Sequence, residues 1–143
     1  MKKAKKKVVI INHFAGAPNI NERSLRHFLI AKELIKKEIE VTIITSQNHY
    51  QSINLNFYKH YKKISIDKVN FIFVNEFVTR KNNLFTKLLK MFSFSFNLFI
   101  SFLFKKIKIN NPDIVISSSP DLFTAIVGYF YSKRVNAAHF IEV

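Results

Sequence analysis

The sequence predicts an α/β domain with a doubly wound, mainly parallel sheet of the Rossmann-like kind. Short β-branched apolar runs alternate along the chain with longer segments of helical periodicity. A strand, a helix and a second strand follow one another near the start, which is the pattern of a βαβ unit. With 143 residues, 48% of them hydrophobic, the chain has the size and apolar content of one folded domain.

The βαβ unit comes first. Val8 to Asn12 is a short, β-branched run, which predicts a strand buried on both faces. Ser24 to Lys37 predicts an amphipathic helix. The apolar stripe of this helix consists of Leu25, Phe28, Leu29, Leu34 and Ile35. Residues 40–46, EVTIITS, predict the second strand.

The remaining elements continue the alternation. Residues 47–68 are polar, aromatic and basic, and we expect them to be irregular. Residues 68–75 predict a third strand, and residues 111–119 a fourth strand that Pro112 introduces. A helix is expected over residues 120–134, with Pro120 near its first turn, and a fifth strand over residues 137–143.

Two loops are expected to meet at the carboxyl ends of the strands, where parallel sheets bind ligands. They are residues 12–22, after the first strand, and residues 117–121, after the fourth. Helix N-termini would supply N–H groups there for an anion. Both loops are equally compatible with ordinary connections, in which Ser118, Ser119 or Asp121 caps the following helix. The chain has two glycines and no glycine-rich nucleotide fingerprint.

Residues 82–110 contain an unusually apolar helical pattern. Polar residues fall on one narrow stripe, interrupted by Phe94: Asn83, Lys87, Lys90, Asn97, Ser101, Lys105 and Lys108. The uncharged run Met91 to Phe104 has 14 residues, fewer than the roughly 20 that a membrane span needs. Two interpretations stay open: a core crossover helix, or an interfacial helix whose lysines meet anionic head groups. The membrane contacts would then be Phe92, Phe96, Phe99 and Leu103.

Composition narrows the function classes. The formal net charge of +14 favours an anionic partner such as nucleic acid, anionic lipid or a phosphorylated substrate, although codon bias can also enrich lysine. The absence of cysteine excludes disulfides and thiolate metal sites. Five histidines without metal-site spacing predict no metal site, and we also expect no cofactor. The basic start has only Val8 to Ile11 as its apolar run, too short for a signal peptide, so we expect a cytoplasmic protein.

Four motifs in order resemble family 4 glycosyltransferases of the GT-B fold, in particular the enzymes that build bacterial surface polysaccharides such as colanic acid and O-antigen. The motifs are HFAGAP at His13 to Pro18, the helix and strand of Ile30 to Ile44, PDIVISSSP at Pro112 to Pro120, and FIEV at Phe140 to Val143. The resemblance is weakest over residues 47–80. Glu38 and Ile39 replace a usual Gly-His pair, so we expect a less well-formed helix end there.

The resemblance implies that residues 1–143 are a single acceptor-side domain, the N-terminal half of a GT-B enzyme, and that the donor-binding domain is absent from this sequence. It implies transfer of a sugar from a nucleotide sugar to a lipid-linked or polysaccharide acceptor, at the inner face of the cell membrane. Because transfer requires both reactants to be held together, we expect no transfer by this chain alone.

The resemblance also implies roles for particular residues, although the catalytic residue stays unassigned. His13, Ala15 and Gly16 would line the binding site, with His13 as the candidate base or simply a polar loop residue. Acceptor phosphate would be held by Arg23 and Arg26, which are otherwise surface charges. Hydroxyl groups of Ser118 and Ser119 would contact sugar. Glu142 stands where the family's cleft segment begins.

Two other functions remain open at this point. The first is a non-catalytic, membrane-associating subunit that pairs with a separate donor-domain chain. The second is a nucleic-acid-binding protein, in which tyrosines and phenylalanines of residues 48–63 stack on bases along a basic groove. The sequence shows no helix-turn-helix, RNP-like or zinc motif, so this second function is the less favoured one.

Overall fold

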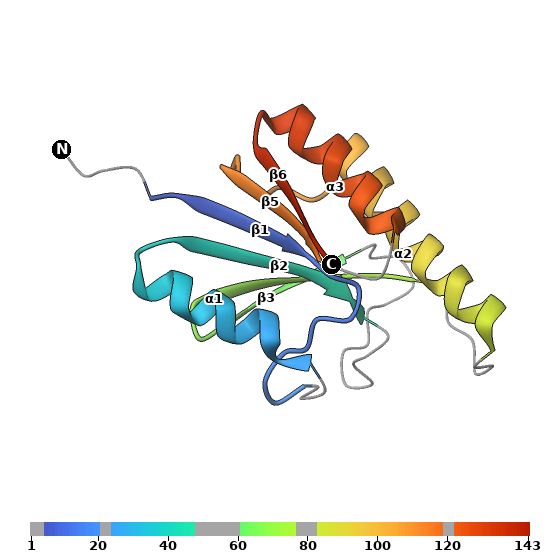
Figure 1. The fold of residues 1–143 in the computed structure, drawn as a ribbon, viewed down its shortest axis with the longest axis horizontal. Coiled ribbons are helices and arrows are strands. Elements are labelled where there is room, and N and C mark those ends of the chain that lie inside the picture. The colour runs from blue at the N-terminus through green and yellow to red at the C-terminus, as the bar shows by residue number, and fades with distance from the viewer. Residues whose placement is uncertain (1–4, 21–23, 48–60, 77–82, 119–121) are drawn as a thin grey trace.

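The computed structural model describes residues 5–20, 24–47, 61–76, 83–118 and 122–143 (Figure 1). These residues form one six-stranded sheet and three helices. In chain order the elements are β1 (Lys7–Ile11), α1 (Arg26–Lys36), β2 (Glu40–Ser46), β3 (Tyr61–Ile66), β4 (Val69–Val74), α2 (Leu84–Leu103), β5 (Ile114–Ser118), α3 (Leu122–Val135) and β6 (Ala138–Glu142).

The strand order is β3-β4-β2-β1-β5-β6, and only β3 runs antiparallel to its neighbour. Leaving β3 aside, the parallel strands lie in the order 3-2-1-4-5 of a Rossmann-like sheet. The chain leaves β1 toward one edge of the sheet and leaves β5 toward the other. The topological switch point therefore lies between β1 and β5, as the sequence predicted.

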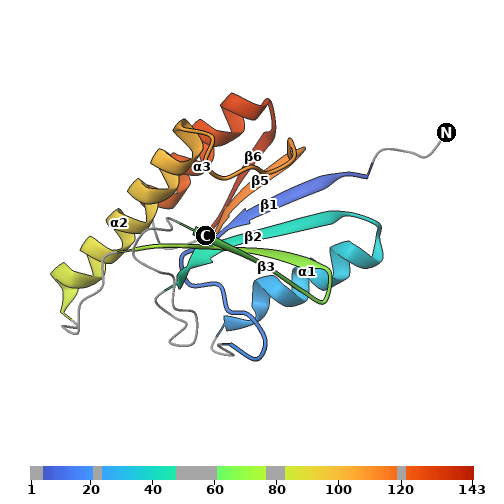
Figure 2. The same ribbon diagram turned by 180° about the vertical axis from the view of Figure 1, so that it is seen from behind.

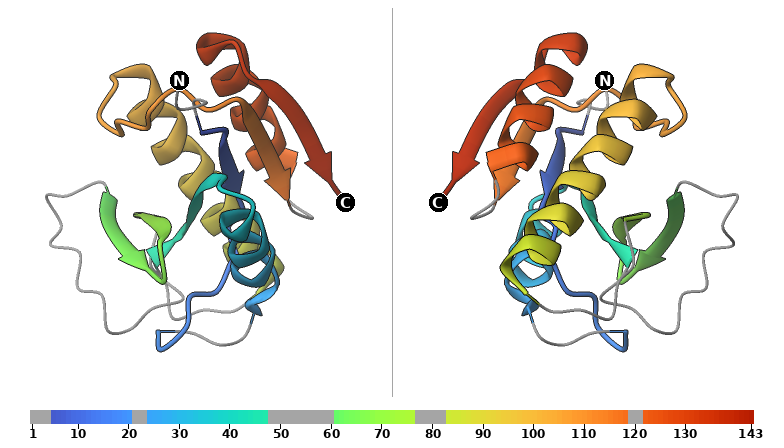
Figure 3. Two further views of the ribbon diagram at one scale, coloured as in Figure 1. Left: turned by 90° about the vertical axis from the view of Figure 1, so that its left-hand side faces the viewer. Right: turned by 90° about the vertical axis from the view of Figure 1, so that its right-hand side faces the viewer.

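Helices cover both faces of the sheet (Figures 2 and 3). Alternate residues of β1 divide between two cores: Val8 and Ile10 pack with the α1 residue Phe28, while Val9 and Ile11 pack with Phe94 of α2. The α3 residues Val127 and Tyr131 belong to the same core as α2. The prediction of a first strand buried on both faces is thus confirmed.

The expectation that residues 47–68 are irregular is wrong for β3. This strand pairs antiparallel with β4, and the two residues between them, Asp67 and Lys68, both have positive φ, 49° and 68°. That is the backbone of a two-residue type I′ hairpin, a turn that normally uses asparagine and glycine. The exposed Lys62 and Lys63 keep this edge of the sheet polar. Residues 48–60, including most of the proposed base-stacking stretch, lie outside the described residues.

Helix α2 is shorter than the pattern suggested, and its polar stripe does not face solvent throughout. The helix starts at a capping box, in which Asn83 Oδ1 accepts from Thr86 N at 2.8 Å and Thr86 Oγ1 accepts from Asn83 N at 3.1 Å. Asn97 Nδ2 donates to Asn75 O at 2.9 Å, and Ser101 is 1% exposed. The stripe through Asn97 and Ser101 therefore packs toward the sheet, while Phe92, Phe96 and Leu103 stay about half exposed.

Each helix ends in a Schellman motif that uses a side-chain-bearing residue in the left-handed conformation. At the end of α1, Glu38 has φ 61° and donates to Ile35 O at 2.9 Å, and Ile39 N donates to Leu34 O at 3.1 Å. Lys105 (φ 52°) and Asn136 (φ 57°) occupy the same position after α2 and α3. The expectation of a poorly formed turn at Glu38 is wrong, because the backbone hydrogen bonds form without glycine.

Candidate functional site

A polar network occupies the switch point at the carboxyl edge of the sheet. The register pairs Ile11 of β1 with Ser117 of β5, so the next residues, Asn12 and Ser118, are neighbours. Asn12 Nδ2 lies 3.3 Å from Ser118 Oγ. His27 Nε2, from the first turn of α1, lies 2.8 Å from Ser118 Oγ and 3.0 Å from Glu142 Oε2 at the end of β6. We call Asn12, Arg26, His27, Ser118 and Glu142 the switch-point network.

Hydrogen bonding assigns the tautomer of His27. Phe14 N donates to Asn12 Oδ1 at 2.7 Å, which fixes the orientation of the amide. The amide nitrogen of Asn12 therefore faces the His27 ring as a donor, 3.3 Å from Nδ1 and 3.5 Å from Nε2. Glu142 Oε2 lies 3.0 Å from Nε2, and because a carboxylate can only accept, we infer that the neutral ring carries its hydrogen on Nε2 and that Nδ1 accepts from Asn12.

This tautomer can be measured. When the His27 ring is neutral, we expect long-range ¹H–¹⁵N correlation spectra to show an unprotonated Nδ1 and a protonated Nε2. The physical reason is the carboxylate of Glu142, which lies 3.0 Å from Nε2 and can only accept a hydrogen bond there. A spectrum with the hydrogen on Nδ1 would contradict the assigned network.

Glu142 is held as a carboxylate. A hydrogen bond from Ser118 keeps its pKa below the ordinary value, and His27 and Arg26 act in the same direction, outweighing partial burial, which raises it. Arg26 also forms an ion pair with Glu142 Oε1. The carboxylate lies against the first turn of α1, where the helix dipole favours negative charge. Its contribution to stability is complete above the pKa of an unfolded glutamate and is lost as the pH falls through the lowered folded value.

The geometry of the network excludes a serine hydrolase triad built from these residues. In such a triad the serine and the carboxylate contact opposite nitrogens of the histidine. Here Ser118 Oγ and Glu142 Oε2 both contact Nε2 of His27. Since Nε2 carries the hydrogen, it cannot take the proton of Ser118. The chemically available group is the ionised, partly exposed carboxylate of Glu142.

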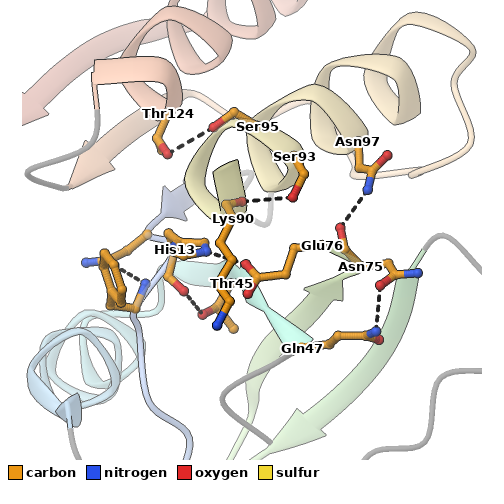
Figure 4. Close-up of polar contacts among 12 residues, drawn as sticks. His13, Thr45, Gln47, Asn75, Glu76, Lys90, Ser93, Ser95, Asn97 and Thr124 are labelled. Atoms are coloured by element: carbon orange, nitrogen blue, oxygen red, sulfur yellow. Dashed lines mark hydrogen bonds and ion pairs between the residues drawn. The ribbon is translucent and has the colours of Figure 1, made fainter. Parts of the chain in front are cut away.

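His13 belongs to a second, buried polar pair on the other side of β1. Its Nε2 bonds to Glu76 Oε2, and the two side chains are 2% and 1% exposed (Figure 4). The rings of Phe14 and Phe94 lie 4.4 and 5.0 Å from the His13 ring, centroid to centroid. Thr45 Oγ1 donates to Ala15 O at 2.9 Å beneath the same loop. The predicted base is therefore enclosed by protein, and its catalytic role stays a prediction.

The other predicted site residues divide into three groups. Arg26, Ser118 and Glu142 come from distant parts of the chain and meet in the switch-point network. The backbone N–H groups of Ala15 and Gly16 already donate within the loop, to Asn12 O at 3.2 Å and Ser24 O at 2.8 Å. Arg23 and Ser119 lie outside the described residues.

Sequence reasoning missed Asn12, His27 and Glu76 as site residues. Asn12 and Glu76 follow β1 and β4 as polar residues at the ends of buried strands, as Ser118 ends β5. That common position at the carboxyl edge was an available signal. His27 gave no signal, because a histidine on the inner side of an amphipathic helix looks like a core residue.

Other features of the surface do not compete for this role. A hollow of about 320 Å³ lies near the start of β2, between β3–β4 and the segment before β5, and is lined by residues such as Glu40, Lys63 and Asn110. Among the described residues, this hollow gathers no comparable network of side-chain hydrogen bonds. Over the described residues, no group of three acidic, histidine or cysteine side chains is placed to hold a metal ion. No helix among them has the length and apolarity required to cross a bilayer.

Comparison with known proteins supports the fold. No protein-family model matches the chain, and no curated protein matches its sequence. Among solved structures, the chain is similar to the C-terminal domain of a hydrogenase from Pyrococcus furiosus, with a TM-score of 0.58 and 13% sequence identity. The match covers 100% of this chain and 94% of that one. Such a low identity carries no information on activity. The chain is an α/β protein with a Rossmann-like, doubly wound sheet.

Proposed function

We propose that this chain is the acceptor-side domain of a glycosyltransferase that transfers a sugar from a nucleotide sugar to a lipid-linked or polysaccharide acceptor in cell-surface glycan synthesis. The observation that carries the proposal is Glu142, an ionised carboxylate held at the switch point of a parallel sheet by Ser118, His27 and Arg26. Ligands of such sheets bind at this edge. The four sequence motifs supply the identity of the reaction.

The carboxylate suits an acceptor hydroxyl. In the proposed reaction the hydroxyl oxygen attacks the anomeric carbon of the donor sugar, and the bond from that carbon to the nucleotide diphosphate breaks. The leaving diphosphate keeps the electron pair, and Glu142 accepts the proton of the hydroxyl. Because its pKa is lowered, Glu142 is a weak base, so its larger contribution is to orient the hydroxyl and stabilise developing positive charge.

The proposal is tested by acceptor binding. We expect farnesyl-diphosphate-linked N-acetylglucosamine, a soluble lipid-linked acceptor, to shift the amide resonances of Asn12, Ser118 and Glu142 in the ¹⁵N-labelled chain. Glu142→Gln should raise the dissociation constant about tenfold, because the hydroxyl loses its charged acceptor. Glu33→Gln is the matched control, since Glu33 is an exposed glutamate paired only with Lys36 among the described contacts.

Two results would contradict the proposal. One is an absence of shifts at the network with this acceptor and with its free sugar. The other is equal binding by Glu142→Gln and wild type. The comparison of Glu142→Gln with wild type is valid only when the control Glu33→Gln binds as wild type.

One alternative has an observation in its favour. A non-catalytic, membrane-associating subunit, paired with a separate donor-domain chain, would use the exposed phenylalanines of α2, of which Phe92 is 50% and Phe96 53% exposed. Peripheral location at the inner face of the membrane is part of both proposals. Vesicle binding without any acceptor-dependent shift at the switch-point network would favour the alternative. The nucleic-acid function draws support from the net charge of +14 and from the aromatic and basic residues of 48–63, most of which lie outside the described residues.

A further inference from the structure

Helices α2 and α3 lie side by side on one face of the sheet (Figures 1 and 2). Their side chains leave a groove between the two helices. Its walls are Phe92, Phe96 and Phe99 of α2 and Phe123, Ile126 and Phe130 of α3. The groove has a volume of about 240 Å³. A smaller hollow of about 40 Å³ shares Phe99 and Phe130 and extends the seam to Arg134. We call the two hollows together the α2–α3 groove.

The groove is apolar because of how its floor and walls are built. Small side chains, Ser95 and Val127, form the floor. The hydroxyl of Ser95 lies 3.4 Å from Thr124 Oγ1, so it is paired within the protein. Ring contacts brace the walls: Phe92 meets Phe123 edge-on at 5.5 Å, and Phe99 meets Phe130 at 6.1 Å. The groove is therefore formed before anything binds.

Its chemistry selects a hydrocarbon. Sites for polar small molecules place a few polar groups among apolar walls, and the larger hollow presents none. An apolar cavity of roughly 150 Å³ is enough to hold benzene. The larger hollow, with about 240 Å³, has room for a segment of an alkyl chain.

Charge decides between a lipid and a second copy of this chain. The net charge of +14 would make two copies repel each other, whereas it attracts an anionic bilayer. Arg134 Nη1 at this end of the seam donates to Phe102 O at 3.2 Å and to Leu103 O at 3.1 Å, at the end of α2. The exposed Lys105 and Lys106 follow that helix end directly, and the exposed Lys133 precedes Arg134. A chain in the seam would place an anionic head group near those cations.

We propose that the α2–α3 groove binds one hydrocarbon chain of an anionic membrane lipid and so anchors this face of the protein on the bilayer. The inference deepens the peripheral membrane location that both proposed functions include, and it does not require sugar transfer. It also differs from insertion of a single helix, because α3 supplies half of the site.

The first test is flotation of the full 143-residue chain with vesicles of equal parts phosphatidylglycerol and phosphatidylcholine. We expect binding that is lost with pure phosphatidylcholine. Phe96→Asp and Ile126→Asp should each weaken it about tenfold or more, because a charge enters the apolar wall. Leu29→Asp is the matched control, since Leu29 is 60% exposed on α1, across the sheet, and should bind as wild type. Equal binding by Phe96→Asp and wild type would overturn the proposal.

The second test reports on the groove itself. The chain has no tryptophan, so a single Phe99→Trp substitution provides a clean fluorescent probe in the groove wall. Monomeric dodecyl phosphate should blue-shift its emission, and inorganic phosphate should not. Brominated phosphatidylglycerol chains should quench Phe99→Trp and spare Leu29→Trp. An emission unaffected by dodecyl phosphate, or a lipid-free dimer that buries the Phe99→Trp probe, would overturn the proposal.

Discussion

Replacing Phe94 with alanine should lower the free energy of unfolding by about 3–5 kcal/mol. Phe94 is 0% exposed and belongs to the core between α2 and the sheet, where its ring lies 5.0 Å from that of His13. Removing the ring loses its burial and leaves a cavity that rigid neighbouring strands cannot close. Urea unfolding followed by circular dichroism measures the change.

Phe96→Ala is the control for this prediction. It removes the same side chain from the same helix, but Phe96 is 53% exposed. We expect the free energy of unfolding to fall by about 1 kcal/mol or less, because the Phe96 ring contributes little buried apolar area. Comparable losses for the two variants would mean that α2 does not present its Phe94 side to the sheet.

Replacing Glu76 with alanine should cost about 3–5 kcal/mol, because it breaks a buried pair. Glu76 and His13 are 1% and 2% exposed, and their bond ties the loop after β1 to the segment after β4. Without Glu76, a buried imidazole loses its carboxylate partner in a region that water does not reach. Glu76→Gln keeps an acceptor oxygen and should lose less than Glu76→Ala.

Glu33→Ala provides the comparison for Glu76. Its partner Lys36 is 68% exposed and Glu33 itself 66%, so we expect no measurable loss in the same urea experiment. If Glu76→Ala cost no more than Glu33→Ala, the His13–Glu76 pair would not be buried in solution.

The parallel sheet was predictable because its strands carry their own signal. Runs such as Val8 to Ile11 are β-branched and apolar, and the order of strands and helices leaves few topologies. The meeting of Ser118 with the loop after β1 followed from that topology alone. The β3–β4 hairpin was missed because Asp67 and Lys68 form its turn without a glycine to mark it.

The side-chain chemistry of the candidate site was less accessible from the sequence. His27 reaches Ser118 only because α1 packs against the carboxyl edge of the sheet, a tertiary contact that no periodic pattern encodes. The pairing of His13 with Glu76 joins residues 63 positions apart. Likewise, the sequence placed Asn97 and Ser101 on the same polar stripe as the lysines, but Asn97 donates to a backbone carbonyl and Ser101 is buried.

The helix ends at Glu38 and Lys105 have a consequence for the stability of the whole molecule. In the left-handed conformation, a residue with a side chain costs roughly 1 kcal/mol or more relative to glycine. The free energy of unfolding of a domain is only about 5–15 kcal/mol in total. The conformational cost at two such positions is therefore an appreciable fraction of it. Glycine at these two helix ends would therefore raise the stability of the protein to heat. Neither position belongs to the core or to the switch point.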